Sequence, residues 1–361
     1  MKSEYSYSNR RLRVRVGDDI LNDVAHEVFL AGGTRALILT MPSRTLRQYA
    51  EMLLEALGER GGGIFDQALP HVPRGAIEAA KDAMKAAGAD CCITLGGGSA
   101  TGLGKALALE AEAHLPVIAV ATTYAGSEAT SIWGISENGR KATGRDDRVA
   151  PTTILYIPAW TSGLPVDLST TSGINAVAHC VEALYAVDAS PMTTLLAEEG
   201  VRAMAHALPR IKANPKDPEA RAEALWGAHL AGRALDSASM ALHHKLCHVI
   251  GGTFQMAHAA THTVILPYAT AYNAPAAPEA MRAVARALGR DDREAAMGLF
   301  ELNRALEVPP SLEAIGFKEA YITQTVDEVL QKTYPNPRPI EKDGLIKLLT
   351  DAFHGNPPGE Y

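Results

Sequence analysis

The strongest constraint on the fold is a change of pattern partway along the 361-residue chain. Before residue 165, short apolar runs alternate with stretches in which apolar residues recur at helical spacing. Beyond it the strand patterns disappear, and Ala- and Leu-rich helical patterns follow one another. Strands that alternate with helices of this length favour right-handed βαβ units in a parallel sheet. The sequence therefore predicts an α/β domain, with a Rossmann-like parallel sheet, over residues 1–164 and an all-α domain over residues 165–361.

The individual elements can be placed from the same patterns. The predicted strands are residues 35–40, 63–68, 91–95, 116–121 and 153–157. The helices predicted between them are residues 43–60, 74–87 and 99–110. The polar stretch 131–152 is compatible with either a hairpin or a loop. The later predicted helices are residues 169–186, 193–207, 218–237, 277–288, 292–306 and 342–353, together with a histidine-rich segment after residue 242.

Charge and cysteine content exclude several classes of protein. The net charge is −7, so the chain lacks the basic surface that nucleic-acid binding requires. No apolar run is long enough to span a membrane, and the first residues lack a hydrophobic signal core. The cysteines form no CxxC pair and read as buried, reduced thiols. We therefore expect a cytoplasmic protein that binds neither nucleic acid nor membrane. The four cysteines are Cys91, Cys92, Cys180 and Cys247.

Two polar turns at successive strand ends indicate a nucleotide site. The string GGGS follows the strand at 91–95 and opens a helix, where glycines let a phosphate approach the backbone and the helix N-terminus attracts it. The next strand ends in ATTYAGSE. A tight structural turn is the alternative, because the string is not the GxGxxG fingerprint. The residues predicted to bind a dinucleotide are Gly96, Gly97, Gly98, Ser99, Thr122, Thr123 and Ser127.

The end of the first predicted strand bears on which dinucleotide is used. Dinucleotide folds often place an acid there, which binds the ribose 2′-hydroxyl. Here the stretch from Thr40 to Arg44 contains Met41 and Pro42 but no acid. Nothing would repel a 2′-phosphate, and Ser43 or Arg44 could accept one. NADH and NADPH are therefore both expected to serve, with Met41 and Pro42 lining the cofactor site.

Histidines are concentrated in two segments of the second domain. Six of the chain's twelve lie there, five of them between residues 243 and 262. Imidazoles suit proton transfer near neutral pH and ligation of transition metals. Scattered histidines on helix faces are the alternative. A Gly251-Gly252 pair is expected to break or bend the histidine segment. The pairs spaced to share one helix face are His244–His248, His258–His262 and Asn175–His179.

The order of these motifs resembles that of the iron-containing (group III) alcohol dehydrogenase superfamily. The matching features are GGGS, TTYAGSE, N-x-x-x-H, and H-x-x-x-H-x9-H before an apolar segment ending in YN. The resemblance covers nearly the whole chain. Longer strings are similar to the maleylacetate reductase branch of that superfamily. They are GGGSATGLGKA, ATTYAGSEATSIWGISENGRKATGRD, SGINAVAHCVEALYA, LPYATAYNAPAAPEAM and YPNPRP.

The resemblance implies a fold, a partner and a reaction. The implied architecture is that of dehydroquinate synthase and the group III alcohol dehydrogenases, with a cofactor domain and a helical catalytic domain in a homodimer. The implied reaction is the reduction of maleylacetate, a small dicarboxylate, to 3-oxoadipate with NADH or NADPH in bacterial degradation of aromatic compounds. Chloromaleylacetates would be further substrates.

Departures from the superfamily pattern suggest catalysis without a metal. Metal-dependent members use an aspartate and three histidines, which correspond here to Asn175, His179, His244 and His258. An amide and three imidazoles offer no anion to a divalent cation, which lowers affinity, so no metal is expected. Gly102 also replaces the acid of the family's GGGS-x-x-D-x-x-K string. The lysine of that string is Lys105, which the resemblance assigns to the cofactor site.

The implied substrate suggests roles for the remaining residues. Hydride would add to the alkene carbon β to the ketone, and the resulting enolate would need a hydrogen-bond donor and a proton. His248 is the family's histidine near the nicotinamide and the first candidate, with His244, His179 and His258 completing the catalytic cluster. The alternative is a metal-dependent alcohol dehydrogenase acting on a small alcohol or aldehyde, or a dehydroquinate-synthase-like enzyme. The residues expected to bind the substrate are Asn175, His243, Arg140 and Lys141, with a solvated loop as the alternative for the last two.

Overall fold

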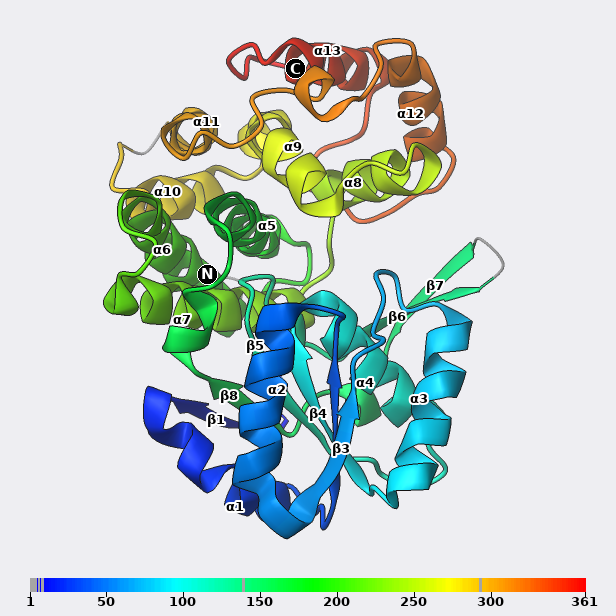
Figure 1. Ribbon diagram of the computed structural model, residues 1–361. Coiled ribbons are helices and arrows are strands. Elements are labelled where there is room, and N and C mark those ends of the chain that lie inside the picture. The colour runs from blue at the N-terminus through cyan, green and yellow to red at the C-terminus, as the bar shows by residue number, and fades with distance from the viewer. Residues whose placement is uncertain (1–4, 6, 8–9, 138–139, 292–293) are drawn as a thin grey trace. The chain divides into compact units, whose positions relative to one another are not determined.

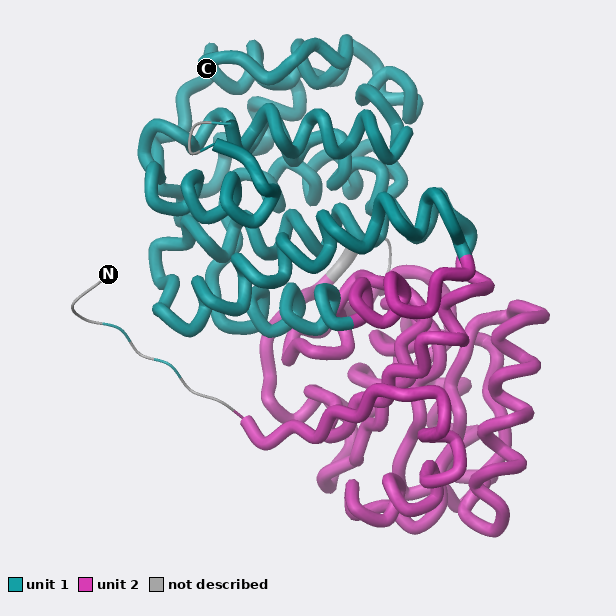
Figure 2. The backbone as a smooth tube through the Cα atoms, turned by 90° about the vertical axis from the view of Figure 1, so that its left-hand side faces the viewer, with its two compact units in different colours: residues 1–7, 165–215, 226–361 teal, residues 8–164, 216–225 magenta. Residues whose placement is uncertain are grey.

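The chain divides into two compact units in a computed structural model that describes residues 5, 7, 10–137, 140–291 and 294–361. The sheet unit comprises Ser8–Leu164 and Lys216–Leu225. The helical unit comprises Met1–Tyr7, Pro165–Pro215 and Trp226–Tyr361. Figure 2 draws the sheet unit in magenta and the helical unit in teal.

The sheet unit is built on six parallel strands in the order β1-β8-β5-β4-β2-β3 (Figure 1). Its central strands are buried on both sides, so they read as continuous apolar runs in the sequence. The predicted combination of an α/β parallel sheet with an all-helical part is confirmed. The strands are β1 (Arg13–Val16), β2 (Ala36–Thr40), β3 (Gly61–Phe65), β4 (Cys91–Gly96), β5 (Val117–Ala121) and β8 (Thr153–Tyr156).

Successive side chains of the central strands β2, β4 and β5 enter cores on opposite faces of the sheet. On β2, Ile38 packs in the core formed with α1 (Val24–Leu30) and α2 (Arg44–Leu57). Its neighbour Leu39 packs in the core formed with α3 (Arg74–Ala87) and α4 (Gly98–Glu110). Figure 1 shows α2 in front of the strands and α4 behind them. The sheet is thus covered by helices on both faces.

The strand order reverses direction between β2 and β4. From β2 the chain continues to β3 at one edge, whereas from β4 it continues to β5 on the other side. Connections that leave neighbouring strands in opposite directions open a crevice at the carboxyl ends of those strands. Two of the segments predicted to bind a dinucleotide, residues 41–42 and residues 96–99, lie at the carboxyl ends of these two strands.

The polar stretch after β5 forms a hairpin. Strand β6 (Ile132–Glu137) pairs with β7 (Arg140–Arg145) in antiparallel fashion, and residues 138–139 between them lie outside the described part. Of the two possibilities that the sequence left open for this stretch, the hairpin is the one observed.

In the helical unit, α5 is the most deeply enclosed element. Every residue from Ser169 to Tyr185 is buried. The helices of this part are α5 (Val166–Tyr185), α6 (Pro191–Ala213), α7 (Pro218–Asp236, which begins in the sheet unit), α8 (Leu242–Thr253), α9 (His258–Asn273), α10 (Pro278–Ala287), α11 (Ala295–Ala305), α12 (Tyr321–Leu330) and α13 (Lys342–His354).

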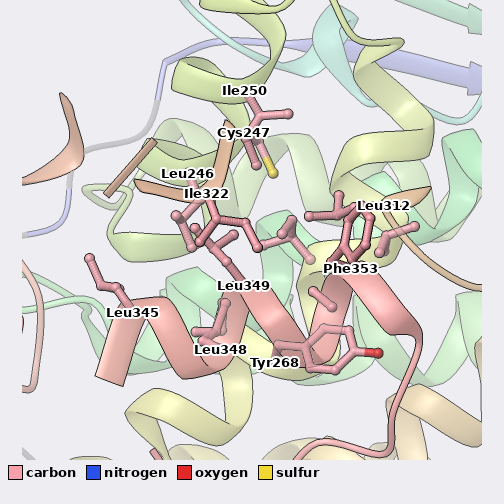
Figure 3. Close-up of a cluster of buried hydrophobic side chains, with 14 of the residues drawn as sticks. Leu246, Cys247, Ile250, Tyr268, Leu312, Ile322, Leu345, Leu348, Leu349 and Phe353 are labelled. Atoms are coloured by element: carbon pink, nitrogen blue, oxygen red, sulfur yellow. The ribbon is translucent and has the colours of Figure 1, made fainter. Parts of the chain in front are cut away.

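A hydrophobic core joins the last helices to the histidine-bearing ones. Leu349 and Phe353 of α13 enter it from one side, and Ile250 of α8 and Tyr268 of α9 enter it from others (Figure 3). Ile322 of α12 packs in the same core. This core fixes α8 and α9 against the end of the chain and so holds the histidine segment in place.

Two features of this unit differ from expectation. The Gly251-Gly252 pair does not break its helix, because the glycines fall in the last turn of α8, which ends at Thr253. The break follows at Gln255, which has φ 54°. Helix α12 was not predicted, since it contains Thr and Val residues of low helical propensity. Burial of Val326 and Val329 in the core outweighs that preference.

Candidate active site

The glycine-rich turn after β4 leaves room for a phosphate. Gly96 has φ 143°, a conformation that favours glycine, and Gly97 is the N-cap of α4. A Cβ atom on Gly97 would meet the side chain of Thr123 at 2.8 Å, whereas one on Gly98 would meet nothing within 4 Å. The open space therefore lies over Gly98, at the start of the helix, where the first amides lack intrahelical partners. This geometry fits the pyrophosphate of a dinucleotide.

The turn after β5, which contains Thr122 and Ser127, is hydrogen-bonded both to the glycine-rich turn and to Lys105. The Thr122 amide donates to the Gly96 carbonyl at 3.0 Å. Lys105 is only 1% exposed, and its ammonium group donates to the Ser127 carbonyl at 2.7 Å and to Thr130 Oγ1 at 2.8 Å. A third bond of 2.8 Å goes to the Ile132 carbonyl. Lys105 thus fixes the shape of the second turn, and its direct contact with a cofactor stays a prediction.

Met41 and Pro42 follow the carboxyl end of β2, the strand that pairs with β4. Met41 is partly buried and packs on the core beneath α3 and α4. Pro42 follows it, and Ser43 caps α2 by accepting a hydrogen bond from the Leu46 amide at 3.5 Å. Their contact with a cofactor also stays a prediction.

The helical unit brings six histidines together. The ring centroids of His179 on α5 and His244 on α8 are 5.1 Å apart, and those of His244 and His262 are 4.9 Å apart. His248 lies 6.0 Å from His244 by the same measure, and His258 lies 4.2 Å from His262. The remaining histidine, His243, is 5.3 Å from His244. Residues that are distant in sequence thus form one cluster (the histidine cluster).

Burial separates the histidines into two groups. His179, His243, His244 and His262 are buried, whereas His248 and His258 are exposed. Burial, followed by the neighbouring imidazoles, holds the pKa values of His179, His243 and His262 well below the usual range. These three rings are therefore neutral at physiological pH. The exposed members are the ones that a substrate reaches most easily.

Glu182 is a site residue that the sequence analysis missed. It lies fully buried on α5, and its carboxylate is 2.6 Å from His244 Nδ1. Its two oxygens also accept hydrogen bonds from the amides of His243, at 2.8 Å, and Ala241, at 3.1 Å. The sequence spacing could have indicated Glu182, because it follows His179 by three residues and so lies on the same helix face.

Several buried polar atoms of the cluster have no hydrogen-bond partner within the described structure. They are Asn175 Oδ1, His179 Nδ1, His243 Nδ1, His244 Nε2 and His262 Nε2. Unpaired buried polar atoms are costly, so such a set is expected where a ligand or ion binds.

A divalent cation is one group that this set could hold. Ring nitrogens of His243, His244 and His262 lie within 4.8 Å of one another, which is close enough for a shared ion. His243 Nε2 and His262 Nδ1 are, however, already 3.0 Å apart in a hydrogen bond. The ligand atoms fit a cation in spacing but supply no negative charge. The absence of a catalytic metal stays a prediction.

Arg140 and Lys141, predicted to bind the substrate, are the first two residues of β7. Their side chains lie outside the described part of the structure, so their role stays a prediction.

No helix among the described residues is both long enough and apolar enough to cross a membrane.

Comparison with known proteins agrees with this arrangement. Residues 12–158 match the family described as iron-containing alcohol dehydrogenase. Residues 169–353 match the C-terminal region of the Fe-containing alcohol dehydrogenase family. The chain belongs to the iron-containing alcohol dehydrogenase family and is an oxidoreductase.

Within this family the chain is similar to maleylacetate reductases. It is 46% identical to the maleylacetate reductase of Sphingobium indicum over 98% of this chain and 99% of that one. The Burkholderia cepacia maleylacetate reductase is also 46% identical, with the same coverage. The crystal structure of the Agrobacterium tumefaciens maleylacetate reductase has a TM-score of 0.94 and 42% identity, covering 99% of this chain and 100% of that chain. The family resemblance drawn from the motifs is confirmed.

Proposed function

We propose that this protein reduces maleylacetate to 3-oxoadipate with NADH or NADPH. The observation that carries the proposal is the histidine cluster, with Asn175 on the helix that bears His179, in a chain that is 46% identical to a maleylacetate reductase over nearly its full length. Chloromaleylacetates are proposed as further substrates. We also propose that the protein acts as a cytoplasmic homodimer in bacterial degradation of aromatic compounds.

The sheet unit supplies the proposed cofactor site. The amides at the start of α4 bind the pyrophosphate over Gly98, and the second turn, held by Lys105, lines the same crevice. No acid lies between Thr40 and Arg44 to reject a 2′-phosphate, so both cofactors are accepted. When bound, the nicotinamide supplies hydride.

The proposed chemistry follows from the shape of the substrate. Maleylacetate contains an alkene conjugated to a ketone and flanked by two carboxylates, so hydride adds to the carbon β to the ketone. Negative charge then develops on the ketone oxygen as an enolate. His248, exposed and adjacent to His244, donates a hydrogen bond to that oxygen. The carbon α to the ketone then takes a proton, for which an imidazolium is a suitable source.

A metal-dependent alcohol dehydrogenase is the second candidate. The spacing of the ring nitrogens of His243, His244 and His262 favours it. The family positions that would hold the ion are Asn175, His179, His244 and His258. A bound cation would act as a Lewis acid on a carbonyl or alkoxide oxygen. We favour catalysis without metal because Asn175 and the imidazoles supply no anion to the ion.

Turnover measurements distinguish the two candidates. Purified protein should oxidise NADH when maleylacetate is added, yield 3-oxoadipate, and keep its activity after prolonged chelation. Simple alcohols with NAD should give little turnover. Activity on ethanol or 1,2-propanediol without any on maleylacetate would overturn the proposed substrate.

A further inference from the structure

Glu182 connects the histidine cluster to the start of α8. We infer that Glu182 is a positioning residue: it fixes the tautomer and orientation of the His244 ring and so directs the unpartnered Nε2 atom into the cluster. Its effect on turnover rests on the proposed function, whereas its effect on the His244 tautomer does not.

The hydrogen bonds around Glu182 determine which nitrogen of His244 carries hydrogen. The His243 amide donates to Oε1 and the Ala241 amide donates to Oε2, so both oxygens already act as acceptors. His244 Nδ1 lies 2.6 Å from Oε2, and an accepting oxygen requires hydrogen on Nδ1. In the tautomer that carries its hydrogen on Nδ1 the lone pair is on Nε2, and this atom is buried and unpartnered.

The same carboxylate holds the ring in position through the backbone. Helix α8 begins at Leu242, and its N-cap, Ala241, provides no side-chain cap. Glu182 supplies that cap from α5, because it accepts from the amides of Ala241 and His243. The His244 ring is further enclosed by His179 and His262. The position of His244 is therefore determined relative to α5, which also bears Asn175.

Replacing one oxygen by an amide nitrogen tests this role with little change of shape. In Glu182→Gln the amide oxygen is expected to keep the shorter bond from the His243 amide and to give up the longer one from the Ala241 amide. The NH2 group then lies opposite His244 Nδ1. An NH2 group donates, so the ring must move its hydrogen to Nε2. Nitrogen NMR of histidine-labelled protein, assigned against His244→Gln, reads the tautomer directly.

The expected result is hydrogen on Nδ1 in the parent and on Nε2 in Glu182→Gln. The kcat for maleylacetate should fall roughly tenfold to a hundredfold, as for other groups that orient a functional histidine. The KM for NADH should stay within about twofold of the parent value. A general loss of structure would not lower kcat while leaving this KM unchanged. Tyr185→Phe is the matched control, since it removes a 3.3 Å bond to Glu182 without touching His244. It should keep the parent tautomer.

An unchanged tautomer in Glu182→Gln would overturn the inference, and so would a changed tautomer with an unchanged kcat. Glu182→Asp keeps the accepting carboxylate and is the variant to test if Glu182→Gln does not fold. Hydrogen retained on Nδ1 with a lowered kcat supports the inference, whereas hydrogen moved to Nε2 contradicts it. If the parent enzyme fails to reduce maleylacetate, the proposed function falls, and the tautomer comparison still decides the role of Glu182.

Discussion

Gly97 and Thr123 approach so closely that a Cβ atom on Gly97 would lie 2.8 Å from both Cγ2 and Oγ1 of Thr123. The turn after β4 and the turn after β5 are therefore in contact at Gly97, which has no side chain. The backbone of Gly97, with φ −100°, is one that any residue can adopt. The requirement for glycine here is one of space, set by the neighbouring turn.

Gly97→Ala should consequently separate the two turns. Overpacking of this kind costs about 1–3 kcal/mol, so the thermal midpoint should fall and the KM for NADH should rise. Gly98→Ala is the matched control for stability, because nothing lies within 4 Å of its added methyl group. That variant should be as stable as the parent or more so, while its methyl group obstructs the phosphate and weakens NADH binding. Equal losses of stability in both variants would contradict the packing described.

NADPH should be used nearly as well as NADH. With no acid between Thr40 and Arg44, the kcat/KM values for the two cofactors should agree within roughly tenfold, or about 1.4 kcal/mol. Initial rates measured across a range of each cofactor provide the comparison. A preference for NADH above roughly a thousandfold, or about 4 kcal/mol, would mean that another group rejects the 2′-phosphate.

Much of this fold could be predicted because its local patterns agree with its tertiary structure. The strands at Ala36–Thr40 and Cys91–Gly96 are buried on both faces and appear as unbroken apolar runs. Short elements escaped detection: α1 spans only Val24–Leu30, and the helical propensity of α12 is low. The members of the histidine cluster could be predicted because pairs of them recur at a spacing of four residues, which places them on one helix face.

The contacts of the site could not be predicted in the same way. Glu182 meets the His243 amide across a sequence separation of 61, and nothing local to either residue indicates that pairing. The assignment of Lys105 to the cofactor, made by resemblance, stays a prediction, and the bonds of its ammonium group to Ser127 and Thr130 could not be predicted. Such contacts depend on which helices pack together, and single-sequence periodicity does not contain that information.

Acid should weaken the sheet unit through Glu27. This buried carboxylate accepts hydrogen bonds from Arg13 at 2.6 Å and from Arg15 at 3.1 Å. The bond from Arg13 contributes most to holding the pKa of Glu27 below its ordinary value of 4.5. Because the folded pKa lies below the unfolded one, the stabilisation is present above pH 4.5 and is lost as the pH falls through the folded pKa.

Glu27→Gln should therefore be less stable than the parent at neutral pH, and the difference should shrink at acidic pH. Denaturant unfolding of both proteins at several pH values gives the comparison. Glu51→Gln is the control for an exposed pair with Arg47, whose loss should change the stability little at any pH. A difference between Glu27→Gln and the parent that grows on acidification would contradict the pairing.

Asn175→Asp should create a metal-dependent site. An aspartate one helical turn from His179 would supply the anionic ligand that the family positions lack here, so affinity for zinc or iron should rise. Catalysis should then respond to chelators, whereas the parent should contain far less than one equivalent of metal. Asn273→Asp, at an asparagine already paired with Asn336, is the control and should gain no metal. Stoichiometric metal in the parent, with activity lost on chelation and restored by iron or zinc, would overturn metal-free catalysis.

The position of the transferred hydride tests the central claim most directly. NADH that carries deuterium at its transferable position should be used to reduce maleylacetate, and the product should be analysed by NMR. Addition to the conjugated alkene, with the enolate stabilised by His248, predicts 3-oxoadipate labelled at the carbon β to its ketone, with the ketone intact. Deuterium on a newly formed carbinol carbon would show that the carbonyl is reduced instead, as by an alcohol dehydrogenase, and would contradict the account.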